Sequence, residues 1–178
     1  MIKRGKVPDE VQFGHNVLVI EDGAGFICYY EVLANGVLDQ EAVIPAMRKL
    51  QKRLGGKIKR ASFDRGFHTP ENQRLLAKIV QHPCLPKKGE ELGRQQQAAA
   101  TVEFRQARQS HPGVESAIGA LQAGNGQERC RDRSRRGYER YVGLGVLGRN
   151  LHVLGKLLLA REAGDCQATQ TKRKARSA

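Results

Sequence analysis

The segment from residue 58 to residue 87, "IKRASFDRGFHTPENQRLLAKIVQHPCLPK", decides the predicted fold. Its first six residues form a short strand that ends at Asp64. Thr69 and Pro70 predict the start of a helix, because threonine caps helix N-termini and proline suits the first helical position. One face of that helix is apolar, and "HPCLPK" predicts a further short strand; the face consists of Leu75, Leu76, Ile79 and Val80. The segment therefore predicts a β-α-β unit with an acid at the carboxyl end of its first strand.

Two β-rich runs precede this unit, "VQFGHNVLVIE" at 11–21 and "GFICYYEVLA" at 25–34. The turn from Asp22 to Gly25 predicts a hairpin, and the nearly continuous apolar character favours a sheet covered on both faces. Asp39 follows as the expected N-cap of a helix that Gly55 and Gly56 close. Its apolar positions recur at helical spacing: Val43, Met47, Leu50 and Leu54.

The second half of the chain is less regular. Residues 87 to 103 predict an irregular excursion, and residues 112 to 122 a helix with Val114, Ile118 and Leu121 on its buried stripe. A longer helix is expected from Gly137, and it carries Tyr141, Leu144, Leu147, Leu151, Leu154 and Leu158. Glycines within it lower its helix propensity, so close packing on a neighbour is expected to compensate. We expect residues 1–160 to form one domain and residues 161–178 a disordered basic tail.

This order of elements predicts an α/β fold, with a mixed sheet flanked by helices and a helical C-terminal part. An antiparallel hairpin followed by a β-α-β unit is compatible with a ribonuclease H-like core.

Basic residues dominate the composition. Lys and Arg number 31 against 18 acids, a net charge of +13, which favours a polyanionic partner, with nucleic acid the leading candidate. Two stretches concentrate the charge, 48–65 and 129–140. Few aromatic side chains are present to stack on bases, so contacts to the phosphate backbone are expected more than base readout.

Asp64 and Glu115 are the candidate catalytic acids. A two-metal phosphoryl-transfer site needs about three converging carboxylates, and α/β sheets build sites at the carboxyl ends of their strands. The alternatives are a turn-forming role for Asp64 and a solvated position for Glu115 in the first turn of its helix.

The sequence predicts neither a zinc site nor a membrane span. The spacing of His82 and Cys84 suits half of a zinc site, but a strand cysteine beside a surface histidine is the preferred interpretation, because no second pair follows. The four cysteines form no CxxC pair, which favours reduced thiols and a cytoplasmic location. Residues 141–159 are not expected to span a membrane, since Arg149, His152 and Lys156 interrupt them.

Four blocks together resemble the carboxyl-terminal half of a bacterial insertion-sequence DDE transposase: "IKRGKVPDEVQFGHNVLVIED" (2–22), "SFDRGFHTPEN" (62–72), "HPGVESAIGAL" (111–121) and "RCRDRSRRGYERYVGLGVLGRNLHVLG" (129–155). The resemblance implies a ribonuclease H-like domain that cleaves and joins DNA with Mg²⁺ or Mn²⁺. Asp64 matches the second acid of the triad and Glu115 the third, so both become expected metal ligands. Arg108, His111 and Gln122 occupy the places of the family's Tyr, Arg and Lys. The candidate DNA contacts are Lys57, Lys59, Arg60, Arg65, His111, Arg129, Arg131 and Arg133.

The first acid of the triad would lie on a strand before Met1, so the sequence predicts a core that is incomplete at its first strand and a lost or impaired activity. Expected partners are the ends of the element and its target DNA, near the bacterial nucleoid. A homo-oligomer or a mixed oligomer with intact transposase is also expected. One alternative is a non-catalytic, basic DNA-binding protein that regulates such an enzyme. Another is an unstable product without function, because a missing strand exposes the edge of its neighbour.

Overall fold

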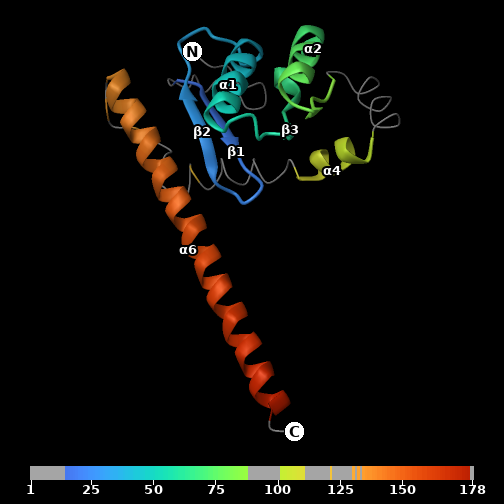
Figure 1. The fold of residues 1–178 in the computed structure, drawn as a ribbon. Coiled ribbons are helices and arrows are strands. Elements are labelled where there is room, and N and C mark those ends of the chain that lie inside the picture. Colours follow the sequence, from blue (N-terminus) through green and yellow to red (C-terminus); the bar gives the residue numbers. More distant parts are fainter. Residues whose placement is uncertain are drawn as a thin grey trace, which may run out of the picture. The chain divides into compact units, whose positions relative to one another are not determined.

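The computed structural model describes residues 15–87, 101–110, 121, 130, 132 and 134–176, and its helices and small sheets make it a mixed α/β protein (Figure 1). It forms two compact units. One falls within Met1–Ile20 and Tyr29–Glu115, and the other within Glu21–Cys28 and Ser116–Ala178. The α/β class predicted from the sequence is confirmed. The described strands form two two-stranded sheets, where the sequence predicted one mixed sheet.

The first sheet is the expected hairpin of β1, Val17–Glu21, and β2, Ile27–Val32. The carboxylate of Asp22 shapes its turn, because Oδ1 accepts hydrogen bonds from the N–H groups of Ala24 at 2.9 Å and Phe26 at 3.0 Å. Gly25 has a φ of 90°, a conformation that side chains disfavour. The expected burial of both faces is only partly met, since Tyr30 is 39% exposed.

Helix α1, Asp39–Arg53, begins one residue earlier than a cap at Asp39 requires, so that prediction is wrong. The N-cap is Leu38, and the side chain of Glu41 accepts a hydrogen bond from its backbone N–H at 3.1 Å. The carboxylate of Asp39 is therefore not used for capping. The predicted end is confirmed, since Gly55 and Gly56 follow the helix with φ values of 63° and 75°. Leu54 is the C-cap and 40% exposed, whereas Val43, Met47 and Leu50 are buried.

The β-α-β unit is confirmed. β3, Arg60–Ser62, pairs in parallel with β4, His82–Cys84, and α2, Pro70–Ile79, connects them (Figure 1). Thr69 is the N-cap of α2, as predicted: its hydroxyl accepts a hydrogen bond from the N–H of Asn72 at 3.0 Å. A short 3-10 helix, η1, Arg65–Phe67, lies between β3 and α2.

A core between α1, α2 and the β3–β4 pair fixes this unit. Met47, Leu76, Val80 and Leu85 are its most buried members, and the expected stripe of α2 faces it. The side chain of Gln51 completes the core, because its amide donates to the carbonyls of Ile58 and Ile79 and accepts from the N–H of Ile58. Helix α4, Val102–Ser110, starts within the stretch predicted to be irregular, and the sequence analysis missed it.

In the second unit, helix α6, Arg135–Arg176, begins two residues before the predicted start. The hydroxyl of Ser134 caps it by accepting from the N–H of Gly137 at 3.0 Å. The helix continues past Arg161, where the sequence predicted a tail. Its buried apolar side chains, among the described residues, are Val142, Val146 and Val153, whereas Leu144, Leu147, Leu151, Leu154 and Leu158 are exposed.

Candidate functional site

Asp64 lies at the carboxyl end of β3, as predicted. Phe63, the residue before it, is buried, and its N–H donates to the carbonyl of Cys84 at 2.9 Å, which extends the parallel pairing to the edge of the site. Asp64 then leaves the sheet with an extended backbone and an exposed side chain. Its Oδ1 accepts a hydrogen bond from the N–H of Arg65 at 2.6 Å. The turn role and the site role are therefore compatible, because one carboxylate oxygen caps η1 while the side chain stays open to solvent.

A second carboxylate faces the same turn. A methyl group placed on Gly66 would lie 3.8 Å from Oδ2 of Asp39, the first residue of α1. From the sequence, Asp39 was expected to cap α1, and its position beside this turn was not predicted. Hard oxygen ligands suit Mg²⁺, which binds through one or two carboxylates and keeps several waters. The donor types at this turn fit that ion, although among the described residues no three His, Cys, Asp or Glu side chains converge.

Asn72 holds the turn in place. It is 6% exposed, and its amide nitrogen donates to the carbonyl of Gln40 at 2.7 Å and to that of Phe67 at 3.0 Å. One side chain thus ties the first turn of α1 to the 3-10 helix that follows Asp64. This role of Asn72 was not predicted; the signal for it in the sequence is its position at the end of the block "SFDRGFHTPEN".

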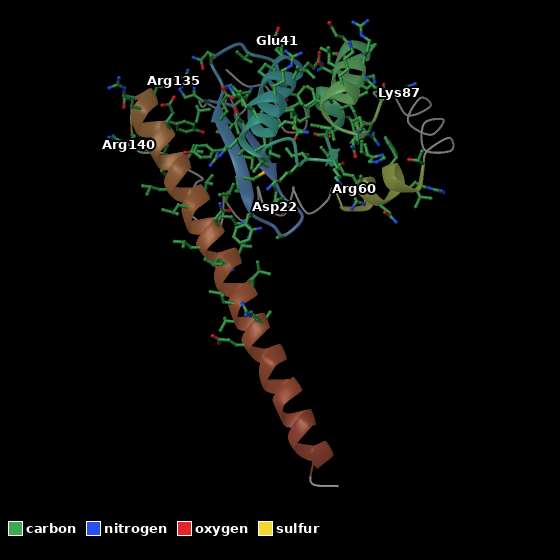
Figure 2. All side chains as sticks on the ribbon, in the orientation of Figure 1. Asp22, Glu41, Arg60, Lys87, Arg135 and Arg140 are labelled. Atoms are coloured by element: carbon green, nitrogen blue, oxygen red, sulfur yellow. The ribbon has the colours of Figure 1, made fainter. Side chains whose placement is uncertain are left out.

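Four basic residues lie on β3 or within three residues of its ends. Lys57, Lys59, Arg60 and Arg65 are all exposed, and within the described part of the chain none of them forms an ion pair. Figure 2 labels Arg60, the first residue of β3. Four unpaired cations within nine residues of an exposed carboxylate give a locally positive surface.

Lys49 differs from these cations, because it is paired. Its ammonium lies 2.9 Å from Oε1 of Glu31, and the hydroxyl of Tyr29 donates to the same carboxylate. The hydrogen bond from Tyr29 and then that from Lys49 hold the pKa of Glu31 below its ordinary value. Lys49 is therefore neutralised locally and serves as a comparison for the unpaired cations.

In the second unit the hairpin tip is fastened to α6 by two polar residues of the helix. Asn150 pairs with both backbone groups of Ile27, and Nη2 of Arg149 lies 4.0 Å from Oε2 of Glu21. Burial raises the pKa of the Glu21 carboxyl, and the charge of Arg149 opposes this rise. These groups serve packing, and we assign them no chemistry.

Several predicted site residues lie outside the described residues: Glu115, His111, Arg129, Arg131 and Arg133. The structure therefore does not place the third acid beside Asp64. At the rejected zinc position, Cys84 is 1% exposed and its thiol donates to the carbonyl of Phe104 at 3.6 Å, whereas His82 is exposed. The two side chains are thus in different environments.

Within the described ranges, one helix is long and apolar enough to cross a membrane by length and composition, at Arg135–Gly164. A single such helix is weak evidence for a span. Arg149 lies in the middle of it and contacts Glu21 of the hairpin.

Searches with family models, among curated proteins and among solved structures each found no match to this chain.

Proposed function

We propose that this chain is part of a DDE transposase of an insertion sequence, with a ribonuclease H-like core. The parent activity is metal-dependent cutting and joining of DNA, and it is lost or impaired in this chain. The observation that carries the proposal is the position of Asp64, which is exposed at the carboxyl end of a strand in a parallel β-α-β unit, with exposed basic residues close to it in sequence. Sites of α/β sheets form at such strand ends, and phosphodiester chemistry needs both an acid and a basic surface.

Each group has a distinct role in this proposal. Asp64 and Glu115 hold a divalent cation, Mg²⁺ or Mn²⁺, which when bound activates the attacking oxygen and stabilises the leaving one. Asn72 positions the turn that carries Asp64. Lys57, Lys59, Arg60 and Arg65 contact DNA phosphates close to the scissile bond.

The test uses the purified full chain, Mg²⁺ or Mn²⁺, and DNA carrying the sequences that flank the gene. Few or no nicked or joined products are expected, because the activity is predicted to be lost or impaired, and Asp64→Asn and Glu115→Gln each abolish any that form. Glu71→Gln is the control, because Glu71 is exposed in the first turn of α2 and should not affect product formation. Products that persist in Asp64→Asn would exclude Asp64 as a metal ligand and overturn the proposal.

A second candidate function is favoured by the unpaired cations alone: a non-catalytic protein that binds DNA and regulates an intact transposase through mixed oligomers. In that case DNA binding is unchanged in Asp64→Asn and Glu115→Gln, and no products form with either metal. Binding that falls steeply with salt supports it, because phosphate contacts release counterions. A chain that neither binds nor cuts DNA excludes both candidates.

A further inference from the structure

The first unit has two edges, and hydrogen bonds fix which residues lie at one of them. Helices α1 and α2 run side by side in the same direction, because Asn72 joins their first turns and Gln51 joins their ends. The amide of Gln51 also donates to the carbonyl of Ile58, just before β3. The N–H of His82 donates to the carbonyl of Lys59 at 2.9 Å, so β4 begins beside β3. Both helices therefore end where both strands begin, and we call this place the amino edge.

Exposed basic side chains gather at the amino edge. They come from the last turns of both helices, from the loop between α1 and β3, and from the first residues of both strands: Lys52, Arg53, Lys57, Lys59, Arg60, Lys78 and His82. Within the part of the chain that the structure describes, no ion pair involves any of them. The sequence has no acid between Glu41 and Asp64. The amino edge therefore carries a dense and uncompensated positive charge.

The acidic side chains described in this unit lie elsewhere. Most of them are at the opposite end of the helices, where β3 ends, and we call this place the carboxyl edge: Asp39, Glu41, Asp64 and Glu71. Glu31 is paired with Lys49. Figure 2 labels one residue from each edge, Glu41 and Arg60. The acids are thus separated along the strands from the basic cluster.

Helix dipoles account for only part of this arrangement. Cations in the last turn of a helix are favoured by about 0.3–1 kcal/mol each, and this applies to those on α1 and α2. The basic residues of the loop and the strands lie outside the helices, and repulsion among like charges lowers the stability of the folded chain. A polyanion that binds at the amino edge removes this repulsion.

We propose that the amino edge binds duplex DNA through its phosphate backbone, at a distance from Asp64 and without the metal. The choice of DNA rests on the proposed function. The site itself goes beyond it, since Lys52, Arg53 and Lys78 were not among the contacts expected from the sequence. Arg60 lies about 13 Å before Asp64 along an extended chain, which equals the rise of about four base pairs. The amino edge therefore holds phosphates beyond the one that faces Asp64.

The spacing of the two helix ends favours a duplex over a single strand. Packed helices lie about 8–10 Å apart, and the grooves of B-DNA are about 6 and 12 Å wide. Cations at the ends of α1 and α2 can therefore reach phosphates on both sides of one groove. The described side chains of the amino edge include no Phe, Tyr or Trp on which an unpaired base could stack. Backbone contacts that are independent of base sequence are expected.

Lys52 and Lys78 are the residues to change, because they lie near the ends of the two helices. Lys49 and Arg74 provide a matched control. They lie about one turn earlier on the same helices, and each contacts a carboxylate, at 2.9 Å and 4.0 Å. Changing either pair to glutamine removes the same positive charge, so a difference between the two variants reports the place of the charge and not its amount.

The experiment measures the affinity of the purified full chain for a labelled duplex of random sequence, in EDTA and at several salt concentrations. Lys52→Gln with Lys78→Gln is expected to weaken binding about tenfold near 0.1 M salt and to lower the slope of log affinity against log salt by about 1.8. Lys49→Gln with Arg74→Gln should stay within about twofold of the wild type. Lys52→Arg with Lys78→Arg keeps both charges and should bind as the wild type does, and circular dichroism checks that every variant is folded.

Asp64→Asn is expected to bind the duplex as tightly as the wild type, and the wild type should bind a single strand of the same sequence more weakly. Wild-type affinity in the Lys52 and Lys78 glutamine variant, or an equal loss in the Lys49 and Arg74 variant, overturns the proposal. So does a chain that does not bind the duplex, a loss of binding in Asp64→Asn, or equal affinity for the single strand. Because EDTA removes the metal and cleavage is not measured, this site and the proposed transposase activity can fail separately.

Discussion

The side chain of Asn150 pairs with the backbone of Ile27 as a neighbouring strand would. Its oxygen accepts from the N–H of Ile27 at 2.8 Å, and its nitrogen donates to the carbonyl of the same residue at 3.0 Å, across 123 positions of sequence. Ile27 is buried, so both backbone groups depend on this one amide.

Asn150→Ala is expected to lower the free energy of unfolding by about 2 kcal/mol, because each buried group without a partner costs about 1–3 kcal/mol. Urea denaturation followed by circular dichroism measures it. His152→Ala changes an exposed residue of the same helix and should leave the midpoint unchanged. Equal midpoints for the Asn150 variant and the wild type would show that water replaces the amide.

Asn72→Ala is expected to destabilise the first unit by about 2 kcal/mol, since the carbonyls of Gln40 and Phe67 lose their donor. Because the turn after Asp64 loses its anchor, any metal-dependent cleavage should fall more than DNA binding. Denaturation and cleavage assays on one preparation measure both effects. Arg74→Ala, on an exposed side chain of the same helix, is the control. A loss of stability without loss of cleavage would limit Asn72 to a packing role.

Replacing the unpaired cations should flatten the salt dependence of DNA binding. Each phosphate contact contributes about 0.9 to the slope of log affinity against log salt, so Lys57→Gln with Arg60→Gln is expected to reduce the slope by about 1.8. Titrations of a labelled duplex at several salt concentrations give the slope. Lys49→Gln should change it much less, because Glu31 already neutralises Lys49. If the double variant keeps the wild-type slope, Lys57 and Arg60 do not contact DNA phosphates.

The ionised carboxylate of Glu31 should stabilise the first unit at pH values above the range in which Glu31 titrates, and this stabilisation should be absent below that range. The hydroxyl of Tyr29 and then the ammonium of Lys49 hold its pKa below the ordinary value of 4.5, so the ionised form favours the folded state. That contribution is complete above pH 4.5 and is lost as the pH falls through the lowered pKa. The stability gap between the wild type and Glu31→Gln should therefore close in acid, as urea unfolding at several pH values can show. Glu71→Gln is the control, because Glu71 makes only an exposed contact of 4.0 Å with Arg74. Its stability should differ little from that of the wild type at every pH.

The features that the sequence predicted correctly depend on interactions between residues close together in the chain. The β-α-β unit, the cap at Thr69, the glycine end of α1 and the position of Asp64 depend on residues only a few positions apart, and backbone sterics and capping decide them. The hairpin is local in the same way, because Asp22 and Gly25 shape the turn themselves.

Long-range packing decided the rest. Helical periodicity shows that α6 is apolar, but both the valines and the leucines fit it, and only the docking of the hairpin tip shows which face is buried. Asn72 and Asn150 look like ordinary polar residues until the backbone groups that they satisfy are brought beside them. Asp39 loses its capping role because Leu38 and Glu41 begin the helix, and it then faces the turn after Asp64. The sequence alone thus determined the local elements and one candidate acid, whereas tertiary contacts determined which side chains surround it, because those contacts join residues far apart in the chain.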